Sequence, residues 1–415
     1  MTIETKCAAL CASAVWLGSA CGSDPAPPGV DAGAFDATVV DVRDAARVGF
    51  DVLPFDSGDR MPSARLAGLP DNTALDLGAY DCMARGFTES IRCDLVTDYS
   101  RLNYDPYVHR VLMFGGGHAA TGRTDVDVLD LTTLTWSSLY PSMTCEEVMA
   151  NDLDPRGFHR ATGHPVARHT YDQNVVAEVG GVGRLVMMST EGFAGYCHSY
   201  DAAIRSVAAL PLAPGVTTWE HGPEMRIPWA YAAAAEFDPV SGAILMVGDT
   251  AGAGEGGMWV IDAATGVATT YVDAVAYPGT IDSNLVYFPP TDTMYGIESS
   301  SPNAVWRMSL DRVDWSRTSN ATVTTTGTPP TGTKGFAYDR ANSVIGGGVA
   351  DDTFFVFDPG ADEWRSERVN VESDVGATPG TMLFHALDYD PVDNVYIFIA
   401  DGPMGRRTWA YRYRR

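Results

Sequence analysis

Positive charge is scarce in this chain. Its 415 residues include 28 Lys plus Arg against 53 Asp plus Glu, which leaves a formal net charge of −25. So large a negative excess repels phosphate backbones and anionic lipid surfaces, and it argues against nucleic-acid partners and polybasic membrane docking. The composition is otherwise that of a globular protein, with 45% hydrophobic and 10% aromatic residues. It therefore excludes a wholly disordered chain.

Several motifs of known chemistry are also missing. The sequence contains no GxSxG serine-hydrolase motif, no HExxH zinc motif, no Walker phosphate loop and no dinucleotide fingerprint. No two of its seven cysteines have CxxC spacing, which argues against a zinc knot or a thioredoxin-like site. The 42 Gly and 25 Pro, together with many Val, Thr, Tyr and Trp, instead favour short strands and turns.

Long hydrophobic runs are absent from the N-terminus. Lys6 precedes an apolar run over 7–17 that is too short for a permanent membrane helix and fits the core of a cleaved export signal. Residues 17–21 (Leu-Gly-Ser-Ala-Cys) resemble a bacterial lipoprotein signal, although Leu17 lies four positions before the cysteine rather than three. That resemblance implies lipidation of Cys21 and a place at the outer membrane or cell surface. An ordinary signal cleaved near Ala20 is the alternative, and it implies a periplasmic or secreted protein.

The sequence divides into three parts. Residues 1–21 are the expected signal, residues 22–60 an extended tether rich in Asp, Ala, Gly and Pro, and residues 61–415 the folded domain. Four cysteines remain beyond Cys21, an even number that suits an oxidising compartment. We expect two disulfides, formed by the pairs Cys145–Cys197 and Cys82–Cys93.

A period of about fifty residues organises the folded domain. An aromatic residue followed by Asp-Pro, or a close variant, marks five of six repeats, and residues 169–185 hold a weaker copy. These landmarks are Tyr104-Asp105-Pro106, Phe237-Asp238-Pro239, Phe288-Pro289-Pro290, Tyr338-Asp339-Arg340 and Tyr389-Asp390-Pro391. Each begins at the end of one strand, and three further strands follow it, such as 110–114 and 126–130. Four antiparallel strands per fifty residues predict an all-β propeller of six blades, with seven as the alternative.

Two repeats carry a more specific signature. Gly115-Gly116 and Gly346-Gly347 end the second strand, while Trp136 and Trp364 each lie six residues after an aspartate. Over residues 62–415 the chain therefore resembles the kelch family, including the propellers of galactose oxidase-like proteins. The chain ends after the third strand of repeat six, so we expect residues 72–80 to supply its outer strand and close the ring. Closure removes free sheet edges.

Most histidines are predicted to lie on one face of this propeller. The loops after second strands and the connections between blades emerge on the same side, where propeller ligand sites usually lie. Seven of eight histidines fall there or in the central channel, and His109 alone falls in an opposite turn. Our candidate catalytic residues are His118, Arg168, His169 and Tyr171; our candidate ligand-binding residues are His198, His221, Arg226, Tyr231 and His385.

Two kinds of function fit these residues, and the sequence leaves open whether the chain is an enzyme. In the first, the propeller binds an extracellular glycan or protein through its histidine-rich loops, as a monomer. In the second, it is a carbohydrate-active enzyme similar to the propeller polysaccharide lyases, in which Arg or His neutralises a uronate while Tyr or His moves the proton. A copper oxidase is disfavoured because Tyr196-Cys197-His198 does not reproduce the galactose oxidase arrangement. The sequence identifies no particular cofactor, and its clustered histidines allow a divalent metal.

Overall fold

The computed structural model describes most of the chain beyond residue 60. The described residues are 61–81, 100–115, 123–150, 153–166, 168, 170–188, 206–224, 230–250, 256–272, 283–298, 302–332 and 334–415, and all belong to the compact unit Val52–Arg415. The predicted signal and tether lie outside them.

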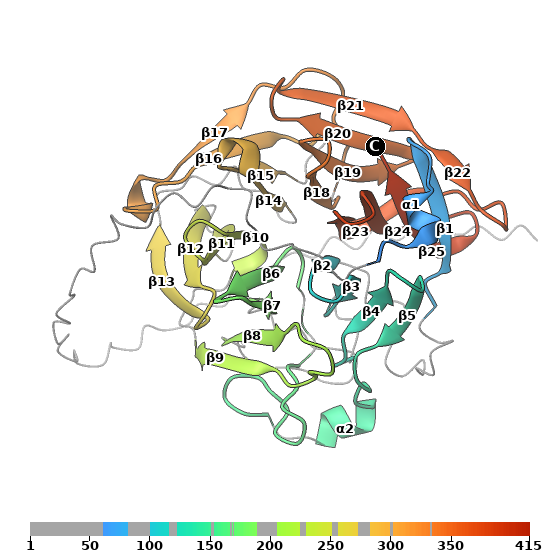
Figure 1. Cartoon of the computed structure of the whole chain (residues 1–415). Coiled ribbons are helices and arrows are strands. Elements are labelled where there is room, and N and C mark those ends of the chain that lie inside the picture. The colour runs from blue at the N-terminus through green and yellow to red at the C-terminus, as the bar shows by residue number, and fades with distance from the viewer. Residues whose placement is uncertain are drawn as a thin grey trace, which may run out of the picture. The chain divides into compact units, whose positions relative to one another are not determined.

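Six four-stranded antiparallel blades form a closed ring, as the sequence predicted (Figure 1). Their innermost strands touch in the cyclic order β2, β6, β10, β14, β18, β23 and again β2. The first three blades are β2 (Asn103–Asp105), β3 (Arg110–Met113), β4 (Asp127–Asp130) and β5 (Thr135–Ser138); β6 (Asn174–Val179), β7 (Val182–Met187), β8 (Ser206–Pro211) and β9 (Glu220–Glu224); and β10 (Ala230–Asp238), β11 (Ala243–Thr250), β12 (Gly256–Asp262) and β13 (Val267–Val272).

The remaining blades repeat the plan, and the last one is completed from the other end of the domain. They are β14 (Asn284–Phe288), β15 (Thr293–Ile297), β16 (Val305–Ser309) and β17 (Ser319–Val323); β18 (Phe336–Asp339), β19 (Val344–Ala350), β20 (Thr353–Asp358) and β21 (Glu363–Arg368); and β23 (Thr381–Asp390), β24 (Val395–Gly402), β25 (Gly405–Arg412) and β1 (Thr73–Ala79). β1 pairs antiparallel with β25, which confirms the predicted closing strand.

A fifth strand was not predicted. β22 (Asn370–Glu372) leaves blade 5 and pairs in parallel with the outer side of β1, from Thr73 opposite Asn370 to Leu75 opposite Glu372. The connection between blades 5 and 6 thus covers the edge that the closing strand would otherwise expose.

The hydrophobic core of the described residues is divided among the contacts between neighbouring blades. In β11, Ile244 and Met246 pack toward blade 2, whereas Leu245 and Val247 pack toward blade 4. Successive side chains of a strand point to opposite faces. The second strands of the blades, such as β3, β15, β19 and β24, are buried on both faces and read as nearly continuous apolar runs, which is why the sequence shows them so clearly. The outer strands β5, β13 and β17 are partly exposed.

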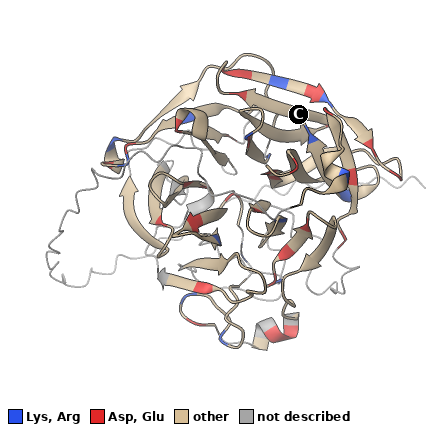
Figure 2. Cartoon of the chain, viewed as in Figure 1, with Lys and Arg blue, Asp and Glu red and all other residues tan. Residues whose placement is uncertain are grey.

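Short helices connect or cover these strands. They are α1 (Ala64–Ala67), α2 (Cys145–Ala150) and the 3-10 turns η5 (Pro289–Thr291) and η6 (Trp315–Arg317). The first turn of α2 is acidic because it contains Glu146 and Glu147, and α2 is partly red in Figure 2. None of the helices described has the length and hydropathy needed to cross a bilayer.

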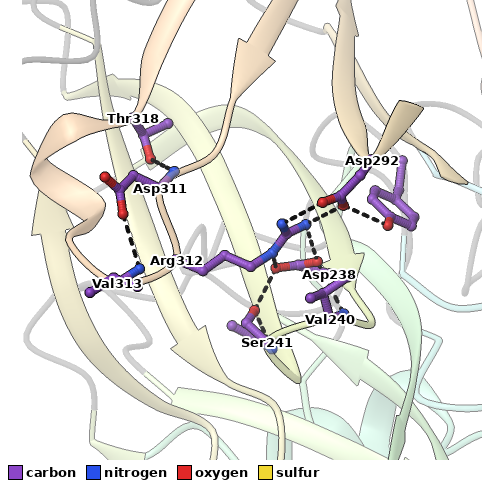
Figure 3. Close-up of polar contacts among 10 residues, drawn as sticks. Asp238, Val240, Ser241, Asp292, Asp311, Arg312, Val313 and Thr318 are labelled. Atoms are coloured by element: carbon purple, nitrogen blue, oxygen red, sulfur yellow. Dashed lines mark hydrogen bonds and ion pairs between the residues drawn. The ribbon is translucent and has the colours of Figure 1, made fainter. Parts of the chain in front are cut away.

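Three of the four landmark aspartates join neighbouring blades. We call Asp238, Asp292 and Arg312 the Arg312 cluster (Figure 3). Arg312 donates from Nε to Asp238 Oδ2 at 2.6 Å and from Nη2 to Asp292 Oδ1 at 2.6 Å. Asp238 belongs to blade 3 and the other two residues to blade 4, so one guanidinium ties two blades together.

Other landmark aspartates have different partners. Asp105 accepts a hydrogen bond from Arg110 Nε at 2.7 Å within blade 1, and Asp339 of blade 5 accepts one from Tyr396 Oη of blade 6 at 3.2 Å. Asp390 of blade 6 lies 3.1 Å from His109 Nε2 of blade 1. The aspartate that marks four of the repeats in the sequence therefore has a structural role at the blade turns.

Candidate functional site

Polar side chains gather at the inner strands, where six blades approach the axis. We define the axial cluster as six residues from blades 1, 2, 3, 4 and 6, namely Arg101, Asp172, Glu236, Asn284, His385 and Asp388. Polar groups this deeply placed require partners. The contacts between them cross the ring rather than following the strand ladders.

Arg101 is the cation of the axial cluster. It precedes β2, and its residue is only 8% exposed. Its Nη1 lies 3.4 Å from Asp172 Oδ1 and donates to the carbonyl oxygen of Ala235 at 3.2 Å, while Nη2 donates to Glu236 Oε2 at 3.1 Å. Both terminal nitrogens of this arginine are thus engaged by blades 2 and 3, which leaves little of its charge for a ligand.

Three carboxyl groups surround that guanidinium. Burial raises the pKa of Asp172 to about 7, although Arg101 opposes the shift. Burial likewise raises the pKa of Glu236 and of Asp388, again against Arg101. Asp172 Oδ2 also accepts a hydrogen bond from the Leu285 backbone at 2.9 Å. One arginine therefore faces three carboxyl groups whose pKa values are all raised by burial.

His385 and Asn284 form the uncharged side of the cluster. Asn284 Nδ2 lies 2.7 Å from His385 Nδ1, so the amide donates and Nδ1 accepts. Burial, with a contribution from Arg101, lowers the pKa of His385 to about 3, and the ring is therefore neutral. Its hydrogen then lies on Nε2. In the part of the chain that the structure describes, neither His385 Nε2 nor Asn284 Oδ1 has a hydrogen-bond partner.

A local irregularity of β23 accompanies the position of His385. The register between β23 and β24 shifts between Met382 and Leu387, and Phe384 has a left-handed φ of 35°. Bulges of this kind re-aim side chains and are frequent next to functional sites. The bulge is therefore a second reason, besides the open hydrogen-bonding atoms, to consider His385 part of a site.

The predicted residues at the entry of blade 2 are buried. Arg168 is 2% exposed and donates from Nε to the Val166 carbonyl at 3.4 Å. Tyr171 is 1% exposed, has a φ of 45° and forms a parallel bridge with Ser100 of blade 1. Tyr171 therefore lies at the contact between blades 1 and 2, and Arg168 lies in the connection that enters blade 2.

His221 contacts the long connection between blades 1 and 2. Its ring stacks on Phe158 with centroids 3.7 Å apart, and its Nε2 lies 3.2 Å from the Gly163 carbonyl oxygen. His164 of the same connection lies against Tyr140, with centroids 4.1 Å apart. These contacts hold the connection against β9, the strand that carries His221.

Several predicted residues cannot be placed. His118, His169, His198, Arg226, Cys21, Cys82, Cys93 and Cys197 lie outside the described residues. Tyr231 lies in β10 and Cys145 begins α2, but the structure does not describe their side chains. The proposed lipidation and disulfide pairs therefore stay predictions.

The sequence analysis missed five of the six axial residues. Glu236 and Asp388 stand directly before the aromatic residue of their landmarks, and Asn103 occupies the same place in repeat one. A polar residue recurring at an innermost strand position was the available signal. Asn284 and His385 also share a position, four residues before the aromatic residue of their landmarks. Arg101 and Asp172 follow no such pattern, because they precede their strands.

Comparison with known proteins gives only distant similarities. No family model and no curated protein matches the chain. A chain from the crystal structure of the mitotic checkpoint complex aligns with a TM-score of 0.42 and 8% identity, covering 78% of this chain and 90% of that one. A luciferin-regenerating enzyme aligns with a TM-score of 0.42 and 10% identity, covering 77% and 94%. Similarities at this level carry no inference about ligand or activity, and the chain is assigned to no family.

Proposed function

We propose that this chain is an exported kelch-like propeller, anchored by lipid on Cys21 and a tether over 22–60, that binds an extracellular glycan at the axial cluster. The observation that carries the proposal is two buried polar atoms, the donor His385 Nε2 and the acceptor Asn284 Oδ1, neither of which has a hydrogen-bond partner among the described residues. Sugar hydroxyls both donate and accept, so they complement such atoms.

The electrostatics of the cluster favour an uncharged sugar. His385 is neutral, and the charge of Arg101 is matched by Asp172 and Glu236. A uronate ligand needs a cation free to pair with its carboxylate. The axial cluster offers none, so the alternative of a polysaccharide lyase gains less support from it than a binding module does.

Burial strengthens each hydrogen bond in the axial cluster. His385 is 0% exposed and Asn284 is 1% exposed. In such a low-dielectric environment a hydrogen bond is stronger than in water, and an unmatched polar group is costly. A ligand that bonds to His385 Nε2 and Asn284 Oδ1 therefore gains affinity from the new hydrogen bonds, and it also removes the cost of leaving these buried atoms without partners.

The test compares variants of the full-length protein on neutral and uronic polysaccharides. We expect calorimetric binding to a neutral polysaccharide, with affinity reduced roughly tenfold by His385→Gln and by Asn284→Asp. The matched control is Arg317→Gln, an exposed residue of η6, which should bind as the wild type does.

Three results would contradict the proposal. These are equal affinity in all variants, binding to a protein ligand alone, and a rise in the absorbance of unsaturated products from uronic polysaccharides. The last of these would establish the lyase. Circular dichroism of each variant separates loss of binding from loss of fold.

A further inference from the structure

A second polar cluster lies on the other side of the blades, at the contact that closes the ring. The His109 cluster consists of His109, in the turn between β2 and β3, with Asp390 at the end of β23 and Asp393 in the turn that follows. His109 and Asp393 are each 3% exposed and Asp390 is 0% exposed. The cluster therefore joins blade 6 to blade 1 and is sealed from solvent.

Its donor atoms have the spacing of ligands around one ion. His109 Nε2 lies 3.1 Å from Asp390 Oδ2 and 3.4 Å from Asp393 Oδ2, and one donor atom from each residue falls within 4.8 Å of the other two. Ligands bound at about 2.1 Å in tetrahedral or octahedral geometry lie about 3.0–3.4 Å apart. The two nitrogen–oxygen distances fall in this range.

We propose that His109, Asp390 and Asp393 form a binding site for a divalent transition-metal ion at the contact between blades 6 and 1. In this site the metal bonds to Nε2 of the neutral imidazole, whose proton leaves to solvent, and to one oxygen of each carboxylate. The metal carries no redox step; it holds the two blades together.

The carboxylates are oriented for this role. Asp390 Oδ1 accepts hydrogen bonds from the backbone of Val392 at 2.9 Å and of Asp393 at 3.4 Å, which leaves Oδ2 toward His109. Asp393 Oδ2 accepts one from the Ser63 backbone at 3.1 Å. The other oxygen, Asp393 Oδ1, is buried and has no hydrogen-bond partner among the described residues, so it is a further candidate ligand atom.

The nearest arginine does not replace the ion. Arg412 donates from Nη2 to the carbonyl oxygens of Leu66 at 2.9 Å and of Asp393 at 2.8 Å. These hydrogen bonds go to the backbone and to neither carboxylate of the cluster. Among the described residues, the side-chain nitrogen that pairs with these carboxylates is that of His109.

The donor set indicates which ions fit. One imidazole nitrogen with carboxylate oxygens suits Zn²⁺, Co²⁺ and Mn²⁺, whereas Mg²⁺ and Ca²⁺ prefer oxygen ligands alone. Zn²⁺ is the natural first probe because it accepts four-coordinate sites with His and Asp ligands. Co²⁺ is the second, because its visible absorption reports its coordination.

The experiment loads the chelator-stripped full-length protein with each ion, both folded and during refolding. We expect about one equivalent of Zn²⁺ per chain at the cluster, a raised unfolding temperature, and a visible Co²⁺ spectrum. His109→Gln should lose that equivalent and that spectrum. His164→Gln, which removes a half-buried histidine outside the cluster, should keep both, and Ca²⁺ should not shift the unfolding temperature.

The proposal is overturned if His109→Gln binds Zn²⁺ as the wild type does, because the metal would then lie at other histidines. It is also overturned if the wild type gains no stability from Zn²⁺ or Co²⁺ by either loading route; the cluster would then be an ion pair that holds only a proton. Should His109→Gln fail to fold, Asp393→Asn keeps the contact of His109 with Asp390 and must show the same loss of metal.

Discussion

The Arg312 cluster and the His109 cluster both link neighbouring blades through carboxylates, but one uses an arginine and the other a histidine. In each, one nitrogen-bearing side chain pairs with two carboxylates and links neighbouring blades (Figure 3 shows the first). Arginine is permanently charged and cannot ligate a metal, whereas histidine exchanges its proton near neutral pH. The contact between blades 3 and 4 is thus fixed, and the contact that closes the ring responds to its surroundings.

The two clusters also differ in burial. The Arg312 side chain is 18% exposed and that of Asp292 42% exposed, whereas all three side chains of the His109 cluster are at most 3% exposed. Water screens the first cluster but hardly reaches the second. Loss of the central side chain should therefore cost much more stability at His109 than at Arg312.

The largest effect is expected from His109→Leu in the presence of a chelator. The substitution leaves Asp390 and Asp393 buried without the imidazole, and the free energy of unfolding should fall by about 3–5 kcal/mol. Urea unfolding of both proteins measures the difference. A loss below about 1 kcal/mol would mean that the cluster does not hold the ring closed.

An intermediate effect is expected from pH alone in the metal-free protein. Burial lowers the pKa of His109, but the hydrogen bonds and charges of Asp390 and Asp393 outweigh burial and raise this pKa to about 9, from 6.5. The stabilisation is therefore complete below pH 6.5 and is lost as the pH rises through about 9. It amounts to about 3 kcal/mol.

Unfolding free energies across this pH range in a chelating buffer measure the loss. His109→Gln should show a flatter profile than the wild type, because its side chain does not titrate. An equal slope in both proteins would assign the pH dependence to another group. Asp172 is the first to examine, since its pKa of about 7 also lies in this range.

The smallest effect is expected from Arg312→Met. Asp238 keeps its hydrogen bonds from Ser241 Oγ at 2.6 Å and from the Val240 backbone at 3.2 Å, so its carboxylate stays partly satisfied. We expect a loss of about 1–2 kcal/mol in unfolding free energy, unchanged from neutral pH to pH 9. A loss as large as that of His109→Leu would show that burial does not separate the two clusters.

The fold was predictable because its signals are periodic. The landmarks fall at blade turns, and the apolar strands between them are buried on both faces, so a single sequence displays six copies of one pattern. The closing strand over 72–80 followed from the incomplete last repeat. β22 was not predictable, because Asn370–Glu372 carries no apolar pattern and pairs through its backbone.

Most residues of the axial cluster and of the His109 cluster could not be predicted from the sequence. Of the axial residues only His385 was predicted, because its position in an innermost strand was visible in the sequence. Arg101 finds its partners in blades 2 and 3, at contacts set by how the blades are arranged around the axis. His109 was excluded from the predicted site because it lies in a turn on the opposite face. Asp390 and Asp393 come close to His109 only when blade 6 packs against blade 1.

The hydrogen bond from the Ser63 backbone to Asp393 has a mechanical consequence. Any tension on the chain before residue 63 reaches the propeller at Ser63 and α1, and only then β1. β1 is held along its length by β25 on one side and β22 on the other, so a pull along it loads many hydrogen bonds together. The strand that closes the ring is in this way also the strand through which a surface-tethered propeller would bear force.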